Sequence, residues 1–225
     1  MEATTLSRRE RERLARRDAM LDAALTVFAD KGYKQATLDE VAARAEFGKG
    51  TLYNYFPKGK QEILFSLLDR LFSDMCEWTH SHFAEAEAAG QTGREMLRTY
   101  IFKHVAYLSE RRDVFALLMQ EVHRIAFDMD LEKVGRMVEM RERMIDQIAA
   151  PIQRAIDRGE IRDLPATIIA HTILGNIKGH LLAVTLEAHA DPSCSFIEYA
   201  DPQRAADLIS TTLLDGLALS PSADA

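Results

Sequence analysis

The residues best suited to binding chemistry form one run, Lys49-Gly50-Thr51-Leu52-Tyr53-Asn54-Tyr55-Phe56. In a helix, Leu52 and Phe56 are four residues apart and share a face that can pack on a core. Lys49, Gly50 and Tyr53 then point outward on another face. Glycine lets a backbone approach a nucleic acid closely, and ammonium and phenol groups bond phosphate oxygens. The run therefore predicts a contact with the grooves of duplex DNA.

Three neighbouring side chains can add to this contact. Thr51 and Tyr55 flank the outward face of the run. Thr37 opens a capping box, where its hydroxyl and the unpaired N–H groups of a helix N-terminus suit a phosphate oxygen. An alternative stays open, in which Tyr53 and Tyr55 are packing residues and Lys49 is a solvated charge.

Catalytic and metal-binding patterns are missing from the sequence. His80 and His82 are two residues apart and point to different helix faces, and Cys76 and Cys194 are distant from each other. The seven histidines and two cysteines thus show neither ligand spacing nor a disulfide framework. The segment 48–50 lacks both the second half of a phosphate loop and a preceding strand. We expect no enzyme, no bound metal and no cofactor.

The composition is that of a globular protein with one large domain or two modest ones. The chain has 225 residues, of which 47% are hydrophobic and 28% charged, and eleven glycines and six prolines are too few for an all-β fold. The first residues are charged, so no secretory signal is expected. The most apolar stretch, 166–186, contains histidine, asparagine and lysine, which disfavours a membrane span. We expect a cytoplasmic protein without a membrane partner.

Charge is unevenly distributed along the chain. Residues 1–60 carry twelve basic and nine acidic side chains, whereas the other 165 residues carry 16 basic and 26 acidic ones. A small basic segment on a larger acidic remainder predicts that the former meets a polyanion. Chance segregation of surface charge is the alternative.

Hydrophobic periodicity predicts three short helices near the N-terminus. Apolar residues recur at helical spacing over 20–28, and Gly32 suits the end of that helix. The capping box over 37–40 opens a second helix through Ala45, and a third spans 49–56 and stops near Pro57. Two short helices separated by about three residues are typical of a helix-turn-helix.

The rest of the chain predicts longer helices, and the fold class is therefore all-α. Pro151 can bend one of these helices, and Asp201 is a suitable N-cap for the last. We divide the chain into a three-helix head (residues 1–59, with a basic arm over 1–17) and a larger helical body (residues 60–225). The apolar stripes of the body cover 60–88, 96–108, 114–125, 134–152, 166–187 and 202–219.

The first quarter of the chain resembles the tetracycline-repressor (TetR) family of one-component regulators. The matching residues are Ala23-Ala24-Leu25, Phe28, Gly32-Tyr33, Thr37-Leu38-Asp39-Glu40-Val41-Ala42, Ala45 and the run from Lys49 to Phe56. The remainder matches in length and helical pattern only. The resemblance implies a homodimer that binds a double-stranded DNA operator through paired heads and is released by a small-molecule effector in each body.

The resemblance also adds to the DNA contacts. Lys60 stands near the place of a lysine at the start of the family's fourth helix, which implies a phosphate contact, and Asn54 lies within the matching run. The candidate DNA-binding residues are therefore Thr37, Lys49, Gly50, Thr51, Tyr53, Asn54, Tyr55 and Lys60.

The turn between the second and third helices departs from the family pattern. Ala45-Glu46-Phe47-Gly48 stands where the family usually has Ala-Gly-Val-Ser. If position 46 has a left-handed backbone, Glu there costs up to about 1–2 kcal/mol relative to Gly. Gly48 replaces a serine that would cap the third helix, although Gly is itself an acceptable N-cap. The link 57–60 is one residue longer than its commonest form.

The helix at 166–187 is apolar on nearly every side, which predicts burial on more than one face. Gly175 and Gly179 permit close crossing by another helix. With the last helix, this pattern predicts a four-helix dimer interface, and an intramolecular core is the alternative. Recognition helices about one DNA turn (~34 Å) apart require such a dimer. The candidate interface residues are Ile173, Ile177, Leu181, Leu213 and Leu217.

Isolated polar groups within the apolar stripes mark a candidate ligand pocket, because pockets hold a few polar anchors in an apolar wall. Nine methionines supply deformable apolar surface. Each anchor can instead be a satisfied core or edge residue, and an acidic body favours a cationic lipophilic ligand. The candidates are Trp78, His82, His104, Met119, His123 and Arg141.

We predict a ligand-responsive DNA-binding transcriptional regulator, most simply a repressor. The alternative from another class is a helical small-molecule binding or carrier protein whose head only packs on its body, and an enzyme on a helical bundle comes third. The arm over 8–17 can reach an adjacent groove, or it is a solvated extension of the first helix.

Overall fold

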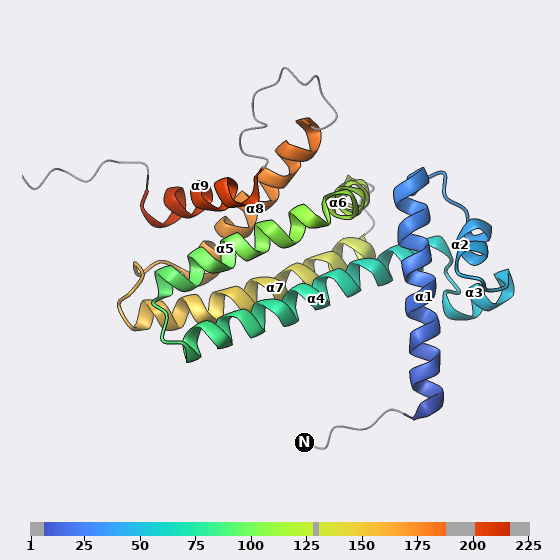
Figure 1. Cartoon of the computed structure of the whole chain (residues 1–225), viewed down its shortest axis with the longest axis horizontal. Coiled ribbons are helices and arrows are strands. Elements are labelled where there is room, and N and C mark those ends of the chain that lie inside the picture. Colours follow the sequence, from blue (N-terminus) through green and yellow to red (C-terminus); the bar gives the residue numbers. More distant parts are fainter. Residues whose placement is uncertain (1–6, 128–130, 188–200, 217–225) are drawn as a thin grey trace, which may run out of the picture. The chain divides into compact units, whose positions relative to one another are not determined.

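The computed structural model describes residues 7–127, 131–187 and 201–216 and is drawn in Figure 1. These ranges contain nine α-helices and no strand, which confirms the all-α prediction. None of the described helices is long and apolar enough to cross a bilayer. In chain order the helices are α1 (Arg8–Lys31), α2 (Leu38–Arg44), α3 (Lys49–Tyr55), α4 (Lys60–Ala88), α5 (Gly93–Glu110), α6 (Arg112–Phe127), α7 (Leu131–Asp157), α8 (Ala166–Glu187) and α9 (Pro202–Leu214).

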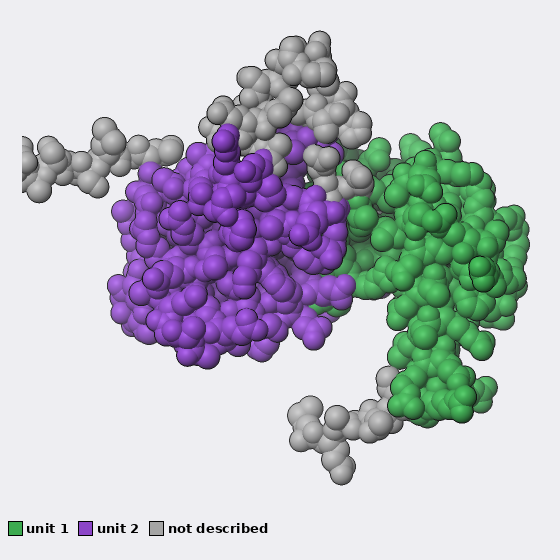
Figure 2. All heavy atoms as spheres, viewed as in Figure 1, with its two compact units in different colours: residues 1–73, 113–134 green, residues 74–112, 135–225 purple. Residues whose placement is uncertain are grey.

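Backbone contacts divide the chain into two compact units, coloured separately in Figure 2. Unit 1 comprises residues 1–73 and 113–134, and unit 2 comprises residues 74–112 and 135–225. The division falls within α4, so this helix contributes its first half to unit 1 and its second half to unit 2. Unit 1 also contains α6, and it is therefore larger than the head over residues 1–59.

Apolar residues at helical spacing build the core of unit 1. α2 packs against both α1 and α3. Each large apolar side chain removed from water contributes about 1.5–3 kcal/mol before the ordering of the chain is counted. The core residues are Met20, Leu21, Ala24 and Phe28 of α1, Val41 and Ala42 of α2, Leu52 and Phe56 at α3, and Ile63, Leu64, Leu67 and Leu68 of α4.

Polar caps mark the beginnings of several helices. At α2, the Glu40 N–H donates to the Thr37 hydroxyl at 3.3 Å and the Thr37 N–H donates to the Glu40 carboxylate at 3.0 Å, which confirms the predicted capping box. The carboxylate of Asp201 accepts the Gln203 N–H at 2.8 Å, so Asp201 caps α9 as expected. At the end of α1, Gly32 has a φ of 78° and donates its N–H to the Phe28 carbonyl, as its place in the sequence indicated.

The segment predicted as a basic arm is helical from Arg8 onward. Ser7 and Glu10 form a capping box at its start, which was not predicted from the sequence. Residues 8–17 therefore continue the first helix, and their contact with an adjacent groove stays a prediction. Residues 1–6 lie outside the described part of the chain.

The body helices follow the predicted bounds, with one correction. α4 and α8 have the limits expected from their apolar stripes, and α7 continues through Pro151. α9 ends at Leu214, although we predicted a helix to residue 219. Gly216 has a φ of 82°, a left-handed conformation that cannot continue an α-helix. Leu217 lies outside the described residues.

Unit 2 is organised around α5, which packs along α9 and also against α8. Ile173, Ile177 and Leu181 of α8 are each at most 1% exposed within this single chain. They belong to the core of unit 2, so the intramolecular alternative applies to these three residues. Leu213 is half-buried.

Candidate nucleic-acid interface

The helix-turn-helix consists of α2, the turn 45–48 and α3, all within unit 1. Glu46 has a φ of 59°, and it is the only non-glycine residue in the described ranges with a positive φ. The N–H of Phe47 donates to the Ala42 carbonyl at 3.0 Å, which closes the turn. Gly48 is the N-cap of α3 and has no side chain to cap it. The left-handed backbone at position 46 is thus present and is occupied by a glutamate.

The outward face of α3 is open to solvent. Tyr53 is 43% exposed and Asn54 is exposed, whereas Leu52 is 1% exposed on the inner face. No atom lies within 4 Å of the position that a Cβ on Gly50 would take. Tyr53 is therefore not a packing residue, and an incoming surface can approach the backbone at Gly50.

Lys49 lies at the first position of α3 and reaches back to α2. Its ammonium is 2.8 Å from Oδ1 of Asp39, and both side chains are more than half exposed. The hydrogen bond to Asp39 raises the pKa of Lys49, so the ammonium stays charged. Because an exposed ion pair of this kind is weak, a phosphate can replace the Asp39 carboxylate.

Three candidate residues beside that face already contact other parts of the protein. Thr51 and Tyr55 are half-buried, and the guanidinium of Arg13 lies 5.9 Å from the centre of the Tyr55 ring. Thr37 is exposed, but its hydroxyl accepts a hydrogen bond within the capping box. The O–H of that hydroxyl can still donate to a phosphate oxygen.

Lys60, at the start of α4, is directed toward the loop between α1 and α2. Its ammonium donates to the carbonyls of Tyr33, Lys34 and Ala36 at 2.7, 3.1 and 2.9 Å. Burial lowers the pKa of Lys60, and the nearby Glu121 carboxylate opposes that shift. All three N–H donors are engaged, so a phosphate would have to compete with backbone carbonyls for this side chain.

A cluster of α6 residues next to Tyr33 was not found from the sequence. The side chain of Glu121 is 3% exposed and accepts from Arg124 at 2.7 Å. Arg124 and Lys60 lie 5.8 and 4.7 Å from the centre of the Tyr33 ring. Burial, and then Glu121, raise the pKa of Tyr33. α6 is distant in sequence from the head, and only the fold brings these groups together.

The ligand-pocket candidates are divided between the two units. Met119 and His123 belong to unit 1, where His123 is exposed and lies 2.7 Å from the Met119 carbonyl. Trp78, His82, His104 and Arg141 belong to unit 2.

Unit 2 brings three of its four candidates together in an aromatic cluster. The Trp78 ring lies 5.8 Å from His82, 6.0 Å from His104 and 5.6 Å from Tyr100, measured between ring centres. Tyr107 stacks on the same indole at 6.4 Å. Neither tyrosine was among the candidates from the sequence. Arg141 is exposed and paired with Glu142 at 2.8 Å.

His104 contacts both Trp78 and Tyr100 in this cluster and is 1% exposed. Its Nδ1 is 2.9 Å from the Tyr100 hydroxyl, whereas its Nε2 has no hydrogen-bond partner in the described structure. Burial, together with the positive charge of Lys178, lowers the pKa of His104 to about 3, so the imidazole is neutral. Lys178 is half-buried and forms no ion pair with a described residue. Lys178 is therefore the charged group that acts on His104, whereas Glu85 and Asp74 act on His82 and Tyr107 at other places in the cluster.

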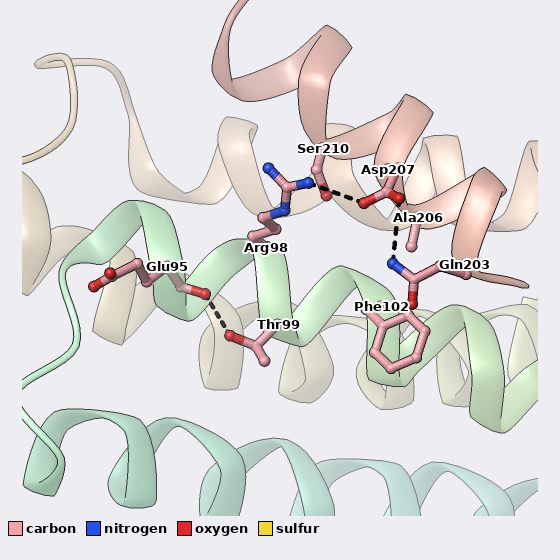
Figure 3. A pocket seen from close by; sticks show the side chains of 8 residues that line it. All are labelled: Glu95, Arg98, Thr99, Phe102, Gln203, Ala206, Asp207 and Ser210. Atoms are coloured by element: carbon pink, nitrogen blue, oxygen red, sulfur yellow. Dashed lines mark hydrogen bonds and ion pairs between the residues drawn. The ribbon is translucent and has the colours of Figure 1, made fainter.

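Shallow pockets also line α9. One, with a volume of 310 Å³, lies between α5 and α9 and is shown in Figure 3. Arg98 and Asp207 bridge across it at 3.0 Å, and Gln203 donates to the same carboxylate. A second pocket of 430 Å³ lies between α8 and α9 and includes Gly175 and Gly179.

No group of three or more His, Cys, Asp or Glu side chains within the described ranges could hold a metal ion. Cys76 is a half-buried free thiol whose pKa is raised by burial, and Cys194 lies outside those ranges.

Comparison with known proteins gives consistent matches. Residues 20–67 match the family described as bacterial regulatory proteins, tetR family. The chain is 26% identical to the fatty acid metabolism regulator protein of Bacillus subtilis over 159 residues, which cover 70% of this chain and 77% of that protein. It is 31% identical to the HTH-type transcriptional repressor KstR of Mycobacterium tuberculosis over 145 residues, 64% of this chain and 60% of that one.

The fold has solved counterparts. The structure of the transcriptional regulator FadR from Bacillus subtilis, in complex with stearoyl-CoA, superimposes with a TM-score of 0.68 at 22% identity. That match covers 89% of this chain and 98% of the other.

Proposed function

We propose that this chain, which belongs to the tetR family of bacterial regulatory proteins, is a DNA-binding transcriptional regulator controlled by a small molecule, most simply a repressor. The observation that carries the proposal is the outward face of α3, where Lys49, Tyr53 and the uncovered backbone of Gly50 lie together on a helix-turn-helix. A chromosomal operator as partner would place the protein in the cytoplasm.

The head would bind by inserting α3 into a major groove. Lys49 would exchange Asp39 for a phosphate, and Tyr53 and Asn54 would bond phosphate oxygens or base edges. Thr51 and Tyr55 would meet the walls of the groove, and Thr37 and Lys60 remain candidates for flanking phosphates.

The operator-binding form would be a homodimer joined through the uncovered face of α8 and α9. Ile168, Leu182 and Leu208 are between 48 and 59% exposed in the single chain. Gly175 and Gly179 have open space where a Cβ would stand, so a partner helix can approach the backbone there. These residues replace Ile173, Ile177 and Leu181 as the expected interface.

The effector would bind in unit 2 at the aromatic cluster that contains Trp78 and His104. Lys178 without a counter-ion and the unpartnered Nε2 of His104 suit an anionic head group, and Trp78 and Tyr107 suit an apolar tail. We therefore favour an amphiphilic anion over the cationic ligand that the acidity of the body suggested. The stearoyl-CoA of the Bacillus subtilis FadR structure is a molecule of this class.

Selection of genomic DNA fragments by the purified protein, at low salt and without effector, tests DNA binding. We expect a specific fragment to be retained, and Lys49→Ala or Tyr53→Ala to weaken its binding. Arg162→Ala removes an exposed charge from unit 2 and should leave binding unchanged. Retention of no fragment above background would contradict the proposal and favour the carrier alternative.

Titration of stearoyl-CoA into the protein–operator complex tests the effector site. Release should need about tenfold more ligand after Lys178→Gln, because this substitution removes one charged hydrogen-bond donor. Arg162→Gln is the matched control. Equal titration curves for the two variants would show that Lys178 does not bind the head group.

A further inference from the structure

The N-terminal half of α1 extends beyond the three-helix core of unit 1. The first buried residue of the helix is Met20, whereas residues 8–16 are all exposed. In Figure 1 these turns continue past α2 and α3. The capping box of Ser7 and Glu10 holds the free end of the helix together. This part of α1 buries no side chain in the core, so core packing does not explain its sequence.

Three arginines of this segment share one face. At 3.6 residues per turn, Arg9, Arg13 and Arg16 lie within about 60° of one another around the helix. We call these three residues the arginine stripe. None of them forms an ion pair with a described residue. The nearby acids are engaged elsewhere, since Glu10 accepts from the Ser7 N–H at 2.8 Å and Glu12 from Arg8 at 2.9 Å.

Two contacts orient the stripe relative to α3. The Arg13 guanidinium lies 5.9 Å from the Tyr55 ring centre. One turn further along, Arg17 lies 5.3 Å from the Phe56 ring centre and donates to the Ser66 hydroxyl at 2.7 Å. The stripe thus begins beside the C-terminal end of the recognition helix and continues away from it along α1.

We propose that the arginine stripe binds backbone phosphates of the DNA next to the groove that receives α3, and so lengthens the interface beyond the helix-turn-helix. This inference rests on the proposed DNA-binding function. Arginine presents a rigid fork of donors that matches phosphate oxygens. Because the segment is already helical, binding does not have to order a flexible arm.

Arg11 provides a matched control on the same helix. It is exposed, forms no ion pair with a described residue, and lies roughly 160° around the helix from Arg13. Arg9→Ala, Arg16→Ala and Arg11→Ala therefore remove the same charge from opposite faces, and alanine preserves the helix.

The experiment measures the dissociation constant for a fragment retained by the wild-type protein at several salt concentrations. We expect the slope of log Kd against log salt to fall by about 0.9 for each phosphate that Arg9→Ala or Arg16→Ala no longer binds. Arg11→Ala should keep the wild-type slope. Hydroxyl-radical footprints should be shorter at their outer edges with Arg9→Ala and Arg16→Ala only.

Equal changes in all three variants would refute the stripe, because a diffuse positive charge would explain them. Wild-type slopes in Arg9→Ala and Arg16→Ala would also refute it. If the wild-type protein itself retains no DNA, the proposed function fails; if it binds DNA and only these slopes stay unchanged, the failure concerns the stripe alone.

Discussion

At the scale of single residues, two side chains occupy positions that are unfavourable for them. Glu46 adopts a left-handed backbone that suits glycine, and His104 is a buried imidazole with one unpartnered nitrogen. The first lies in the turn that orients α3, and the second lies at the proposed effector site. Strain and unsatisfied polar groups often mark functional positions, where the surrounding structure maintains them.

Replacing Glu46 by glycine should stabilise the protein by about 1 kcal/mol, because glycine adopts positive φ without steric strain. Urea denaturation gives the change in the free energy of unfolding. Glu46→Ala retains the Cβ and serves as the control. A gain as large in Glu46→Ala as in Glu46→Gly would show that the charge of Glu46, not its backbone, is unfavourable.

The buried His104 predicts a pH dependence of stability. Its pKa is about 3 in the folded protein and about 6.5 when unfolded, so below pH 6.5 only the unfolded state takes up the proton. Stability is therefore present above pH 6.5 and is lost as the pH falls toward 3, by about 1.4 kcal/mol per pH unit from this residue.

Urea denaturation at pH 7.5 and pH 5.0 checks this value against His104→Phe, which cannot titrate. The wild-type protein should lose about 2 kcal/mol more than the variant between the two pH values. Equal losses would mean that His104 is protonated in the folded state.

At the scale of the elements, one lysine side chain connects the start of α4 to the loop before α2. Lys60 donates to three carbonyls of the segment after α1 and faces Tyr33, which also meets Arg124 of α6. Buried carbonyls without a donor are costly. The start of α4, the segment after α1 and the last turn of α6 are therefore coupled within unit 1 through the surroundings of Tyr33.

Lys60→Met should lower the free energy of unfolding by about 1.5–3 kcal/mol, because it removes the charged hydrogen bonds to the loop. Lys58→Met, on an exposed side chain two residues earlier, is the control. Operator binding separates a structural role from a phosphate contact. A salt slope reduced by about 0.9 in Lys60→Met would show that this ammonium also binds DNA, whereas an unchanged slope assigns it to the loop.

At the scale of the whole molecule, the proposed operator binding would depend on the association of two chains. The uncovered face of α8 and α9 combines exposed aliphatic side chains with two glycines that have open space beside them. A substitution on this face can block a partner without disturbing the fold of the single chain.

Gly179→Arg should produce a monomer, because the new side chain has room in one chain and clashes only with a partner. Sedimentation velocity measures the association state, and operator affinity should fall in parallel. Leu131→Arg places the same side chain at an exposed apolar position of α7, not on α8 or α9, and should remain dimeric. A dimeric Gly179→Arg protein that binds its operator would place the interface elsewhere.

Local chemistry was sufficient to predict the helices and the division of the run from Lys49 to Phe56 into a buried and an exposed face. Several signals act over only a few residues, so neighbouring positions in the sequence are enough to predict their effect. These signals are helical periodicity, the Thr37 capping box, Gly32 and the Asp201 cap. The limits of α4 and α8 and the burial of Leu52 followed from such signals. The left-handed backbone at Glu46 was instead suggested by the glycine that the family usually has at this position.

Tertiary structure alone decided which of several equivalent surfaces each side chain meets. The periodicity of α8 could not distinguish the buried Ile173 from the exposed Leu182, because both lie on an almost uniformly apolar helix. Likewise, Lys60 donates to carbonyls after α1, and Lys178 lowers the pKa of His104. Both pairs are far apart in the sequence, so local sequence patterns cannot predict these contacts.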